Sequence, residues 1–331
     1  MNLGFAKSVR FSRRGFLFGS SAVLAAGCQS TSNPFSDGSE KCTEGGIRVR
    51  FLGSGAAGWN PATLKKNPHA RRQSSVLIEN KILIDFTPCS FDLLPEGCRP
   101  EVLFQTHSHG DHYNPKAAVK VGVKRMYVHE SWAAAARAEV QAAAAELALP
   151  APEVIGLPFA RPVTVCGLQV TAVPSNHSTS RVTDGVLERT ALYLVEKGPS
   201  RLLYATDTGG IPGDAARMIG IDRHVNEQSF PVRYANNPFV HEPCPITALI
   251  MEATDGDLDD DFRMFVHSSA QLVVRTVSAL LKTQRFVPPE GQRAYLTHLG
   301  IKYRNWPSER IEHDLSDAVR AAADGLEVVL G

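Results

Sequence analysis

From residue 47 to the end of the chain, short apolar runs recur, and glycine, proline or polar residues separate them. Residues 47–53 alternate between apolar and polar positions before a glycine-rich turn, which predicts a β-strand. Similar patterns predict strands at residues 74–80, 81–86, 101–106, 125–130, 191–197, 200–207, 247–253 and 293–299, and two strands on either side of Gly167 within residues 163–174.

Longer segments predict helices at residues 131–149, 213–220, 268–283 and 308–324, with Ser131 and Ser308 as candidate N-caps. Because the strands end in polar residues and alternate with these helices, the pattern favours a layered α/β domain with functional loops at the strand ends. Residues 221–245 are long and irregular, which is typical of a lid, a binding loop or a small insertion.

The first 46 residues differ from the rest of the chain. Basic residues open it, and the apolar segment 15–27 then runs up to Cys28. This segment is too short for a transmembrane helix and fits the core of a signal peptide. Residues 29–46 are polar and rich in serine and glycine, which predicts a flexible linker. We therefore expect an export signal at 1–28, a linker at 29–46 and one domain at 47–331.

Two short patterns refine the export prediction. Residues 12–17, SRRGFL, resemble the twin-arginine export signal, and residues 24–28, LAAGC, resemble a lipoprotein cleavage box that would leave Cys28 acylated. The resemblance implies a periplasmic protein that a lipid at its N-terminus holds on the membrane. An ordinary cleaved export signal with an incidental Cys28 is the alternative.

Charge and cysteine content exclude some partners. The 35 Lys and Arg residues balance 34 Asp and Glu residues, so no bulk charge recruits nucleic acid, and we expect a small-molecule substrate. Oligomeric state cannot be read from the sequence. Cys89 and Cys98 flank a short loop and could pair in an exported protein, but spacing does not decide this.

The densest chemistry lies in residues 105–113, QTHSHGDHY, directly after an apolar run. His107, His109, Asp111 and His112 fall within six positions, and Gly110 permits a sharp turn between them. Neutral imidazole and carboxylate are ligands for zinc and related divalent ions. Four ligands on so short a loop cannot all bind one ion, so the pattern favours two neighbouring ions.

The histidine cluster resembles the signature of the metallo-β-lactamase-fold hydrolases. Four further segments match that pattern in order: ILIDF with Asp85, VPSNHST with His177, LLYATDTGG with Asp207 and YLTHLG with His298. The resemblance covers residues 47–306. It implies a four-layered αββα fold, in which two sheets pack face to face and the site lies at one edge.

The resemblance also implies how the ligands divide. His107, His109 and His177 would hold one ion, Asp111, His112 and His298 the other, and Asp207 would bridge them. Asp85 would brace the loop by hydrogen bonding. Zinc is the first expectation for both ions, and manganese, iron or nickel suit the same donors.

Two later segments indicate a branch of this family. MEAT at residues 251–254 and FVHSSAQ at 265–271 resemble motifs of ribonuclease Z and of phosphodiesterase relatives. There His267 would protonate the leaving oxygen and Glu252 would orient it. The expected catalytic residues are therefore Asp111, Glu252 and His267. The alternative is that Glu252 ends a strand by chance and His267 caps the following helix.

The sequence also departs from the branch. Met251 stands where the branch has a histidine, and residues 58–75 contain no cysteine that could hold a structural zinc. The clustered residues Lys65, Lys66, Arg71 and Arg72 could steer a phosphate or form a solvated basic loop.

The function predicted is a dinuclear metal-dependent hydrolase acting on small or cyclic phosphodiesters. One alternative is hydrolysis of lactones, carboxylic esters or β-lactams at the same two ions, where Glu252 and His267 would be dispensable. A binding or sensing protein that has lost activity is a third possibility, which the intact ligand set disfavours.

Twin-arginine export would allow metal insertion during cytoplasmic folding. Replacing Arg13 and Arg14 together by Lys should therefore stop active protein from reaching the periplasm, as measured by metal-dependent activity in cell fractions. Unchanged export of active protein from the double variant would count against this route.

Overall fold

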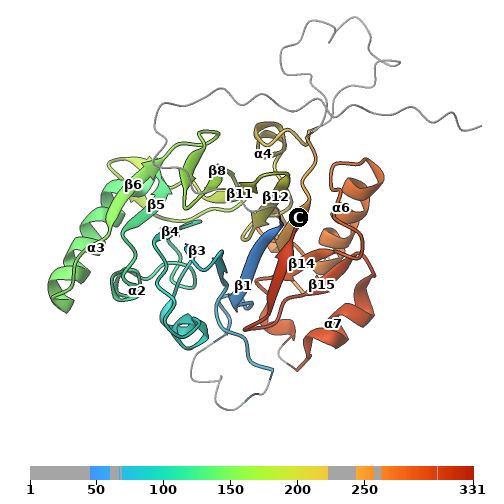
Figure 1. Ribbon diagram of the computed structural model, residues 1–331, viewed down its shortest axis with the longest axis horizontal. Helices are drawn as coiled ribbons and strands as arrows, with labels where there is room; N and C mark the ends of the chain where they lie inside the picture. The colour runs from blue at the N-terminus through green and yellow to red at the C-terminus, as the bar shows by residue number, and fades with distance from the viewer. Residues whose placement is uncertain (1–44, 60–66, 68, 223–243, 257–261, 304) are drawn as a thin grey trace, which may run out of the picture. The chain divides into compact units, whose positions relative to one another are not determined.

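The computed structural model describes residues 45–331 except 60–66, 68, 223–243, 257–261 and 304 (Figure 1). The predicted signal segment, nearly all of the predicted linker and most of the loop at 221–245 lie outside the described residues. None of the described helices is long and apolar enough to cross a membrane.

Two seven-stranded sheets form the centre of the fold. In sheet order, the first contains β16 (Glu327–Leu330), β1 (Ile47–Gly53), β2 (Ser75–Ile78), β3 (Ile82–Ile84), β4 (Val102–Phe104), β5 (Arg125–His129) and β6 (Glu153–Leu157). The second contains β15 (Val319–Ala321), β14 (Ala294–Thr297), β13 (Ala248–Glu252), β12 (Ser200–Ala205), β11 (Ala191–Lys197), β8 (Leu168–Pro174) and β7 (Val163–Val165). A two-stranded hairpin, β9 (Val182–Thr183) and β10 (Val186–Leu187), lies apart from both sheets.

Helices cover the outer face of each sheet, as Figure 1 shows. The first sheet packs against α2 (Pro115–Val121) and α3 (Ala133–Leu147), and the second against α4 (Gly213–Met218), α6 (Ala270–Lys282) and α7 (Ser308–Leu315). Short 3-10 helices are η1 (Pro88–Leu93), η2 (Glu130–Trp132), η3 (Phe262–Phe265) and η4 (Ile301–Tyr303).

Alternation along the strands separates three hydrophobic cores. In β4, Val102 and Phe104 face the second sheet, whereas Leu103 faces α2 and α3. In β12, Leu202 and Tyr204 face the first sheet, whereas Leu203 faces the helices on the other side. Because successive side chains of a strand point to opposite faces, a doubly covered sheet needs apolar residues at every position. The predicted α/β fold with four αββα layers is therefore confirmed.

The predicted strands are present, and the structure corrects the helix predictions in two places. Ser131 is not an N-cap, because it lies in η2 and its hydroxyl accepts a hydrogen bond from the backbone of Arg189. Helix α7 ends at Leu315, and residues 319–321 form β15, which pairs in parallel with β14. Ser308 is the first helical residue rather than the cap, and its hydroxyl contacts Arg71 and the carbonyl of Ala322.

The carboxyl ends of six strands meet at one edge of the two sheets. β3 and β4 run parallel in the first sheet, and β12, β13 and β14 run parallel in the second. β8 shares their direction, because it is antiparallel to β11, which is antiparallel to β12. Loops at this edge can therefore bring together residues that lie far apart in the sequence.

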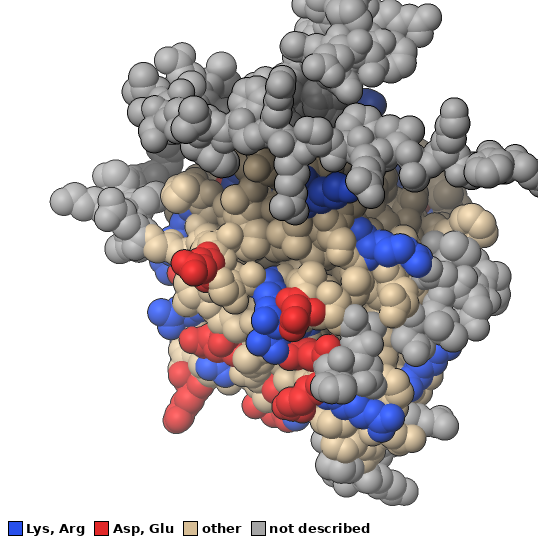
Figure 2. Space-filling model, turned by 90° about the vertical axis from the view of Figure 1, so that its right-hand side faces the viewer, with Lys and Arg blue, Asp and Glu red and all other residues tan. Residues whose placement is uncertain are grey.

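Figure 2 shows the face that carries α6, α7 and β15, and on it acidic and basic side chains are interspersed. Arg320 pairs with Glu312 across this face, and Arg293 approaches Asp317 at 3.7 Å. Exposed pairs of this kind contribute little to stability, so the hydrophobic cores carry the fold.

Phe104 lies at the centre of the core between the sheets, where its ring stacks on Tyr127 at 4.8 Å and meets the edge of Tyr193 at 5.3 Å. Replacing Phe104 by Ala should lower the free energy of unfolding by about 3–5 kcal/mol, because it leaves a cavity between two sheets that cannot collapse. Urea denaturation measures this change. Leu149→Ala is the control, since Leu149 is 44% exposed and its loss should cost under about 0.5 kcal/mol. Equal effects of the two variants would contradict the assigned core.

Candidate metal centre

The histidine-rich loop leaves the end of β4 and turns back before α2. The backbone N–H groups of His112 and Tyr113 both donate to the carbonyl of His109, at 3.0 and 2.8 Å. Asn114 then caps α2 by accepting a hydrogen bond from the backbone of Ala117. This tight turn brings His107, His109, Asp111 and His112 close to His177 and His298, which follow strands of the second sheet.

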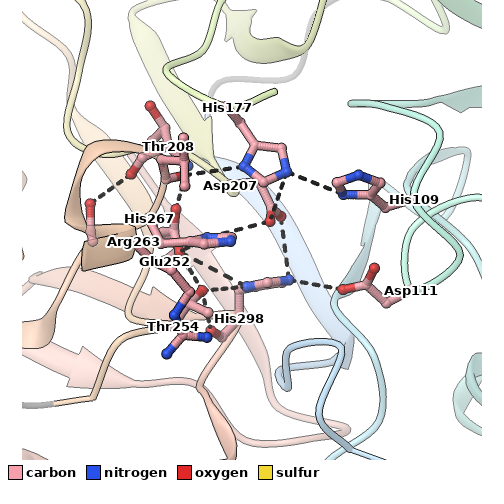
Figure 3. Close-up of polar contacts among 12 residues, drawn as sticks. His109, Asp111, His177, Asp207, Thr208, Glu252, Thr254, Arg263, His267 and His298 are labelled. Atoms are coloured by element: carbon pink, nitrogen blue, oxygen red, sulfur yellow. Dashed lines mark hydrogen bonds and ion pairs between the residues drawn. The ribbon is translucent and has the colours of Figure 1, made fainter. Parts of the chain in front are cut away.

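Three other predicted site residues follow strand ends and share an uncommon backbone conformation. Asp85, Asp207 and His298 have positive φ angles of 55°, 48° and 49°. Non-glycine residues rarely adopt this left-handed conformation, and it costs about 1–3 kcal/mol unless the surrounding structure imposes it. Each strand is therefore followed by a sharp turn that directs an ionisable side chain into the shared edge, and Figure 3 shows two of these side chains, Asp207 and His298.

One group of three histidines directs ring nitrogens toward a common point. His109 Nδ1 lies 3.0 Å from His107 Nε2 and 3.2 Å from His177 Nε2. The outer nitrogens of two of these rings are hydrogen-bonded: His107 Nδ1 contacts the hydroxyl of Thr106, and His177 Nδ1 contacts the carbonyl of Val266. A carbonyl can only accept, so His177 carries its proton on Nδ1 and presents the lone pair of Nε2 inward.

A second group lies beside the first. His112 Nε2 is 3.0 Å from His298 Nε2, and Asp111 Oδ2 is 3.3 Å from both nitrogens. His112 Nδ1 contacts Asp85, and His298 Nδ1 contacts the hydroxyl of Thr254, so the outer nitrogen of each ring is again occupied. Both groups of three could hold a metal ion, since their donor atoms lie within 4.8 Å of one another.

Asp207 lies between the two groups, as Figure 3 shows. Its Oδ1 is 3.9 Å from His177 Nε2, and its Oδ2 is 2.8 Å from His112 Nε2 and 3.3 Å from His298 Nε2. Among the described residues, Oδ2 is buried and has no partner with hydrogen-bond geometry. A buried carboxylate oxygen of this kind needs a cation, so the residues fit the expected bridging role.

The protonation states at the centre follow from burial and from the close approach of histidines and carboxylates. Burial lowers the pKa of His107 well below its usual value, and the charge of His112 adds to this, so His107 is neutral. Burial also disfavours charge on His112, but Asp207, Asp111 and Asp85 outweigh it and raise the pKa of His112 well above its usual range. Without metal, a proton therefore balances the carboxylates at His112, and a bound ion has to displace it.

Asp85 braces the loop by contacts at both of its oxygens. Its Oδ1 accepts the backbone N–H of Thr106 at 2.9 Å, and its Oδ2 lies 2.7 Å from His112 Nδ1. The hydroxyl of Thr106 also donates to this carboxylate, at 2.8 Å. One buried carboxylate thus orients both ends of the histidine cluster.

A second brace was not predicted from the sequence. The fully buried carboxylate of Glu188 accepts the backbone N–H of Ser108 at 2.7 Å and also the hydroxyl of Ser108. Thr179 adds a third hydrogen bond to the same carboxylate at 3.0 Å. Glu188 follows the hairpin formed by β9 and β10, a segment with no chemical pattern, so only the fold reveals its contact with the loop.

Glu252 and His267 lie beside the two groups of ligands. Glu252 ends β13 with a fully buried side chain, and its Oε2 is 3.0 Å from His267 Nδ1. His267 is not the cap of α6, because Ser269 accepts the hydrogen bond from Leu272 that caps this helix. The pairing of Glu252 with His267 is therefore a real contact, and the helix-cap alternative is wrong.

Thr254 is another site residue that sequence reasoning missed. Its hydroxyl donates to Glu252 and lies 2.6 Å from His298 Nδ1, so it links the acid–histidine pair to a candidate ligand. Met251, where the resemblance led us to look for a histidine, packs in the core between the second sheet and its helices.

A cavity of about 230 Å³ opens over this centre. Its wall contains seven residues named above, five small or apolar residues and two cations: His109, Asp111, His177, Asp207, Thr254, His267, His298; Ala56, Ala57, Gly58, Gly300, Ile301; Arg263 and Lys302. A small substrate entering it would meet both groups of ligands and His267 at once.

Comparisons with known proteins agree with this fold. A family model described as a beta-lactamase superfamily domain matches residues 85–229. Zn(2+)-bound PqqB from Methylobacterium extorquens is 17% identical with a TM-score of 0.57, covering 85% of this chain and 99% of that chain. No curated protein sequence is detectably similar to this chain.

Two further solved structures are similar. The metallo-beta-lactamase fold protein YhfI from Bacillus subtilis is 14% identical with a TM-score of 0.52, covering 85% of this chain and 99% of that chain. Human tRNase Z, short form, is 17% identical with a TM-score of 0.53, covering 86% of this chain and 99% of that chain. The chain has the metallo-β-lactamase fold. In this fold the two groups of candidate histidine and aspartate ligands lie together at one sheet edge.

The structure also describes two of the four clustered basic residues and the cysteine pair. Arg71 is buried and donates to Ser54, Ser308 and the carbonyl of Ala322, so it supports the fold rather than steering a phosphate. Arg72 pairs with Asp92 and with Asp324. Lys65 and Lys66 lie outside the described residues. Cys89 and Cys98 are free thiols and form no disulfide with each other.

Replacing Asp85 by Asn should weaken metal binding by about 10–100-fold, because an amide cannot accept the hydrogen bonds of both Thr106 and His112 in the same way. Competition against a chromophoric chelator measures the affinity. Asp92→Asn is the matched control, since Asp92 is an exposed partner of Arg72 away from the centre. If the Asp85 variant bound metal with wild-type affinity, the proposed role of Asp85 in orienting the metal ligands would be contradicted.

Proposed function

We propose that this protein is a metal-dependent phosphodiesterase that acts on small or cyclic phosphodiesters. The observation that carries the proposal is the pair formed by Glu252 and His267: Glu252 Oε2 lies 3.0 Å from His267 Nδ1, and His267 lines the cavity together with candidate ligands. A fold neighbour named as a tRNase is consistent with phosphodiester chemistry, although this likeness shows only the fold.

The proposed centre would hold two divalent ions, zinc by first preference. His107, His109 and His177 would bind one ion, Asp111, His112 and His298 the other, and Asp207 would bridge them. Bound divalent ions supply Lewis acidity toward the phosphoryl oxygens and lower the pKa of water so that it can attack at neutral pH.

His267 would donate the proton that the departing oxygen needs. Burial disfavours its charged form, but the hydrogen bond and the charge of Glu252, with Asp207 and Asp255, raise the pKa of His267 to about 9. The imidazolium is therefore the main form at neutral pH, and Nδ1 is committed to Glu252. Nε2 is then the donor toward the substrate, since expulsion of an unprotonated alkoxide from phosphorus is slow.

Glu252 is held in place by three donors. Besides His267, it accepts the backbone N–H of Thr208 and the hydroxyl of Thr254. Since its side chain is fully buried, Glu252 has no water to share its charge, and His267 receives a strong, fixed interaction. This arrangement orients the ring and favours its protonated form, which is the role proposed for Glu252.

Hydrolysis of a lactone, a carboxylic ester or a β-lactam is the alternative function. A metal ion can hold the leaving group in those reactions, so the buried pair would contribute little. In this structure the buried carboxylate of Glu252 contacts the ring of His267 and accepts two further hydrogen bonds that hold it in place. A fixed pair of this kind favours a substrate whose leaving group needs a proton.

His267→Ala should lower kcat for a cyclic nucleotide, whose leaving group is an alkoxide, by about 10²–10⁴-fold with metal content unchanged, because a proton donor is lost and the ligands are not. Bis-p-nitrophenyl phosphate should be affected much less, since p-nitrophenolate leaves without a proton. In the wild type, kcat should fall as pH rises through the pKa of His267, which is about 9 without bound ions and lower with them, because cations disfavour imidazolium. The variant should lack this fall.

His69→Ala serves as the control, because His69 is a described histidine that does not line the cavity. Parallel assays with a lactone and with nitrocefin test the alternative. Turnover of either compound that is indifferent to His267→Ala, with no phosphodiester turnover, would replace the proposed function. Loss of metal from the variant would instead make His267 a ligand.

A further inference from the structure

We propose that Glu188 is a positioning residue for only one of the two ions, here called the first ion, whose candidate ligands are His107, His109 and His177. Its loss should weaken the first ion and spare the second ion, whose candidate ligands are Asp111, His112 and His298. The inference rests on the proposed function, from which it takes the two ions, and it adds the residue that sets the affinity of one of them.

His109 differs from the other candidate ligand histidines in how its ring is held. The outer nitrogens of the other four rings contact a hydroxyl, a carboxylate or a carbonyl, which belong to Thr106, Asp85, Val266 and Thr254. Among the described residues, the ring of His109 has hydrogen-bonding contacts only with its fellow ligands His107 and His177, both through Nδ1. Partners on the outer nitrogen normally orient a ligand ring, so the direction of His109 depends on its backbone.

Glu188 restrains that backbone through Ser108, the residue between His107 and His109. The carboxylate accepts the backbone N–H of Ser108 at 2.7 Å and also the hydroxyl of Ser108. Two hydrogen bonds to one residue restrict both the position and the orientation of the short turn that separates the two ligands. Glu188 therefore supplies, through the backbone, the restraint that the ring of His109 lacks.

The segment around Glu188 also reaches His177, the third ligand of the first ion. Thr179, two residues after His177, donates to the carboxylate of Glu188 at 3.0 Å. Thr190, two residues after Glu188, donates to the backbone carbonyl of His177 at 3.0 Å. Glu188 and its neighbours thus connect the two chain segments that carry all three ligands of the first ion.

The histidines of the second ion are held by other residues. Asp85 contacts His112 at 2.7 Å, and Thr254 contacts His298 at 2.6 Å. Within the described part of the chain, Glu188 forms no hydrogen bond or ion pair with any ligand of the second ion. The two ions therefore depend on different supporting residues, and loss of Glu188 should act on the first ion.

Burial makes the contacts of Glu188 strong. Its side chain is fully buried, so water does not compete for the carboxylate. Arg181 Nε lies 3.7 Å away, and Arg181 also donates to Glu139 of α3 at 2.6 Å. An apolar side chain in place of Glu188 would leave the N–H of Ser108 without an acceptor, and the turn would have to move to find one.

Glu188→Leu tests the proposal, because leucine fills most of the space and accepts no hydrogen bond. Competition of the metal-free full chain for zinc against chromophoric chelators yields a dissociation constant for each ion. One constant should rise by about 10–100-fold while the other keeps its wild-type value. Anomalous diffraction at the zinc edge, from variant crystals at limiting zinc, should then place the remaining ion beside His112 and His298. Glu188→Gln should recover part of the affinity, since its amide oxygen can still accept one hydrogen bond.

Glu146→Leu is the matched control, because Glu146 is an exposed carboxylate of α3 that pairs with Lys116, and it should change neither constant. A purely structural role for Glu188 would lower the Tm of the metal-free protein and weaken both ions equally, and that result would overturn the proposal. Unchanged constants for both ions would overturn it as well.

Two further outcomes are also decisive. If Glu188→Leu does not fold, Ser108→Ala takes its place, and it should weaken the first ion several-fold because one of the two hydrogen bonds is lost. Wild-type constants in Ser108→Ala would then overturn the proposal. Metal binding is measured without substrate, so two bound ions in a wild type that hydrolyses no phosphodiester would overturn the proposed function and leave the role of Glu188 to be decided by the variants.

Discussion

Charge compensation at a buried sheet edge is the constraint on which the rest of the site depends. Asp85, Asp111 and Asp207 are buried with imidazoles to balance their charge, and Asp207 Oδ2 makes no hydrogen bond of good geometry to the described residues, although His112 Nε2 lies 2.8 Å away. Buried carboxylates in this number are too costly unless cations neutralise them. A proton on His112 meets this need in part, and divalent ions held by the two groups of candidate ligands would meet it more fully. The left-handed turns after β3, β12 and β14 place Asp85, Asp207 and His298 in this arrangement, and the contacts of these side chains offset the backbone strain.

Sequence reasoning reached the architecture because both sheets are doubly covered and most strands read as continuous apolar runs. It was wrong at residues 319–321, where an alanine-rich segment favours a helix locally. Pairing with β14 buries Val319 and Ala321 against the second sheet, and this tertiary contact overrides the local preference. β16 also went unpredicted, since its pairing with β1 joins residues about 280 positions apart.

The candidate ligands could be read from the sequence because histidine and aspartate at strand ends are uncommon and their order is specific. Glu188 and Thr254 could not, because glutamate and threonine occur widely and their partners lie 80 and 44 positions away. Both residues act by hydrogen bonds that only the folded chain creates. Residues that position a ligand are therefore harder to find from sequence than the ligand itself, although the geometry of the centre depends on both.

Glu252 connects parts of the site that would otherwise be independent. Its carboxylate contacts the residue after Asp207, the threonine that holds His298, and the ring of His267. A shift of Asp207 or His298 on metal or substrate binding would therefore change the position of His267 through the buried carboxylate of Glu252. Residues in a shared hydrogen-bond network do not contribute additively, so the energetic role of Glu252 exceeds any single contact. The choice between a phosphodiester and a carbonyl substrate consequently rests on this carboxylate more than on the ligands, which both reactions would share.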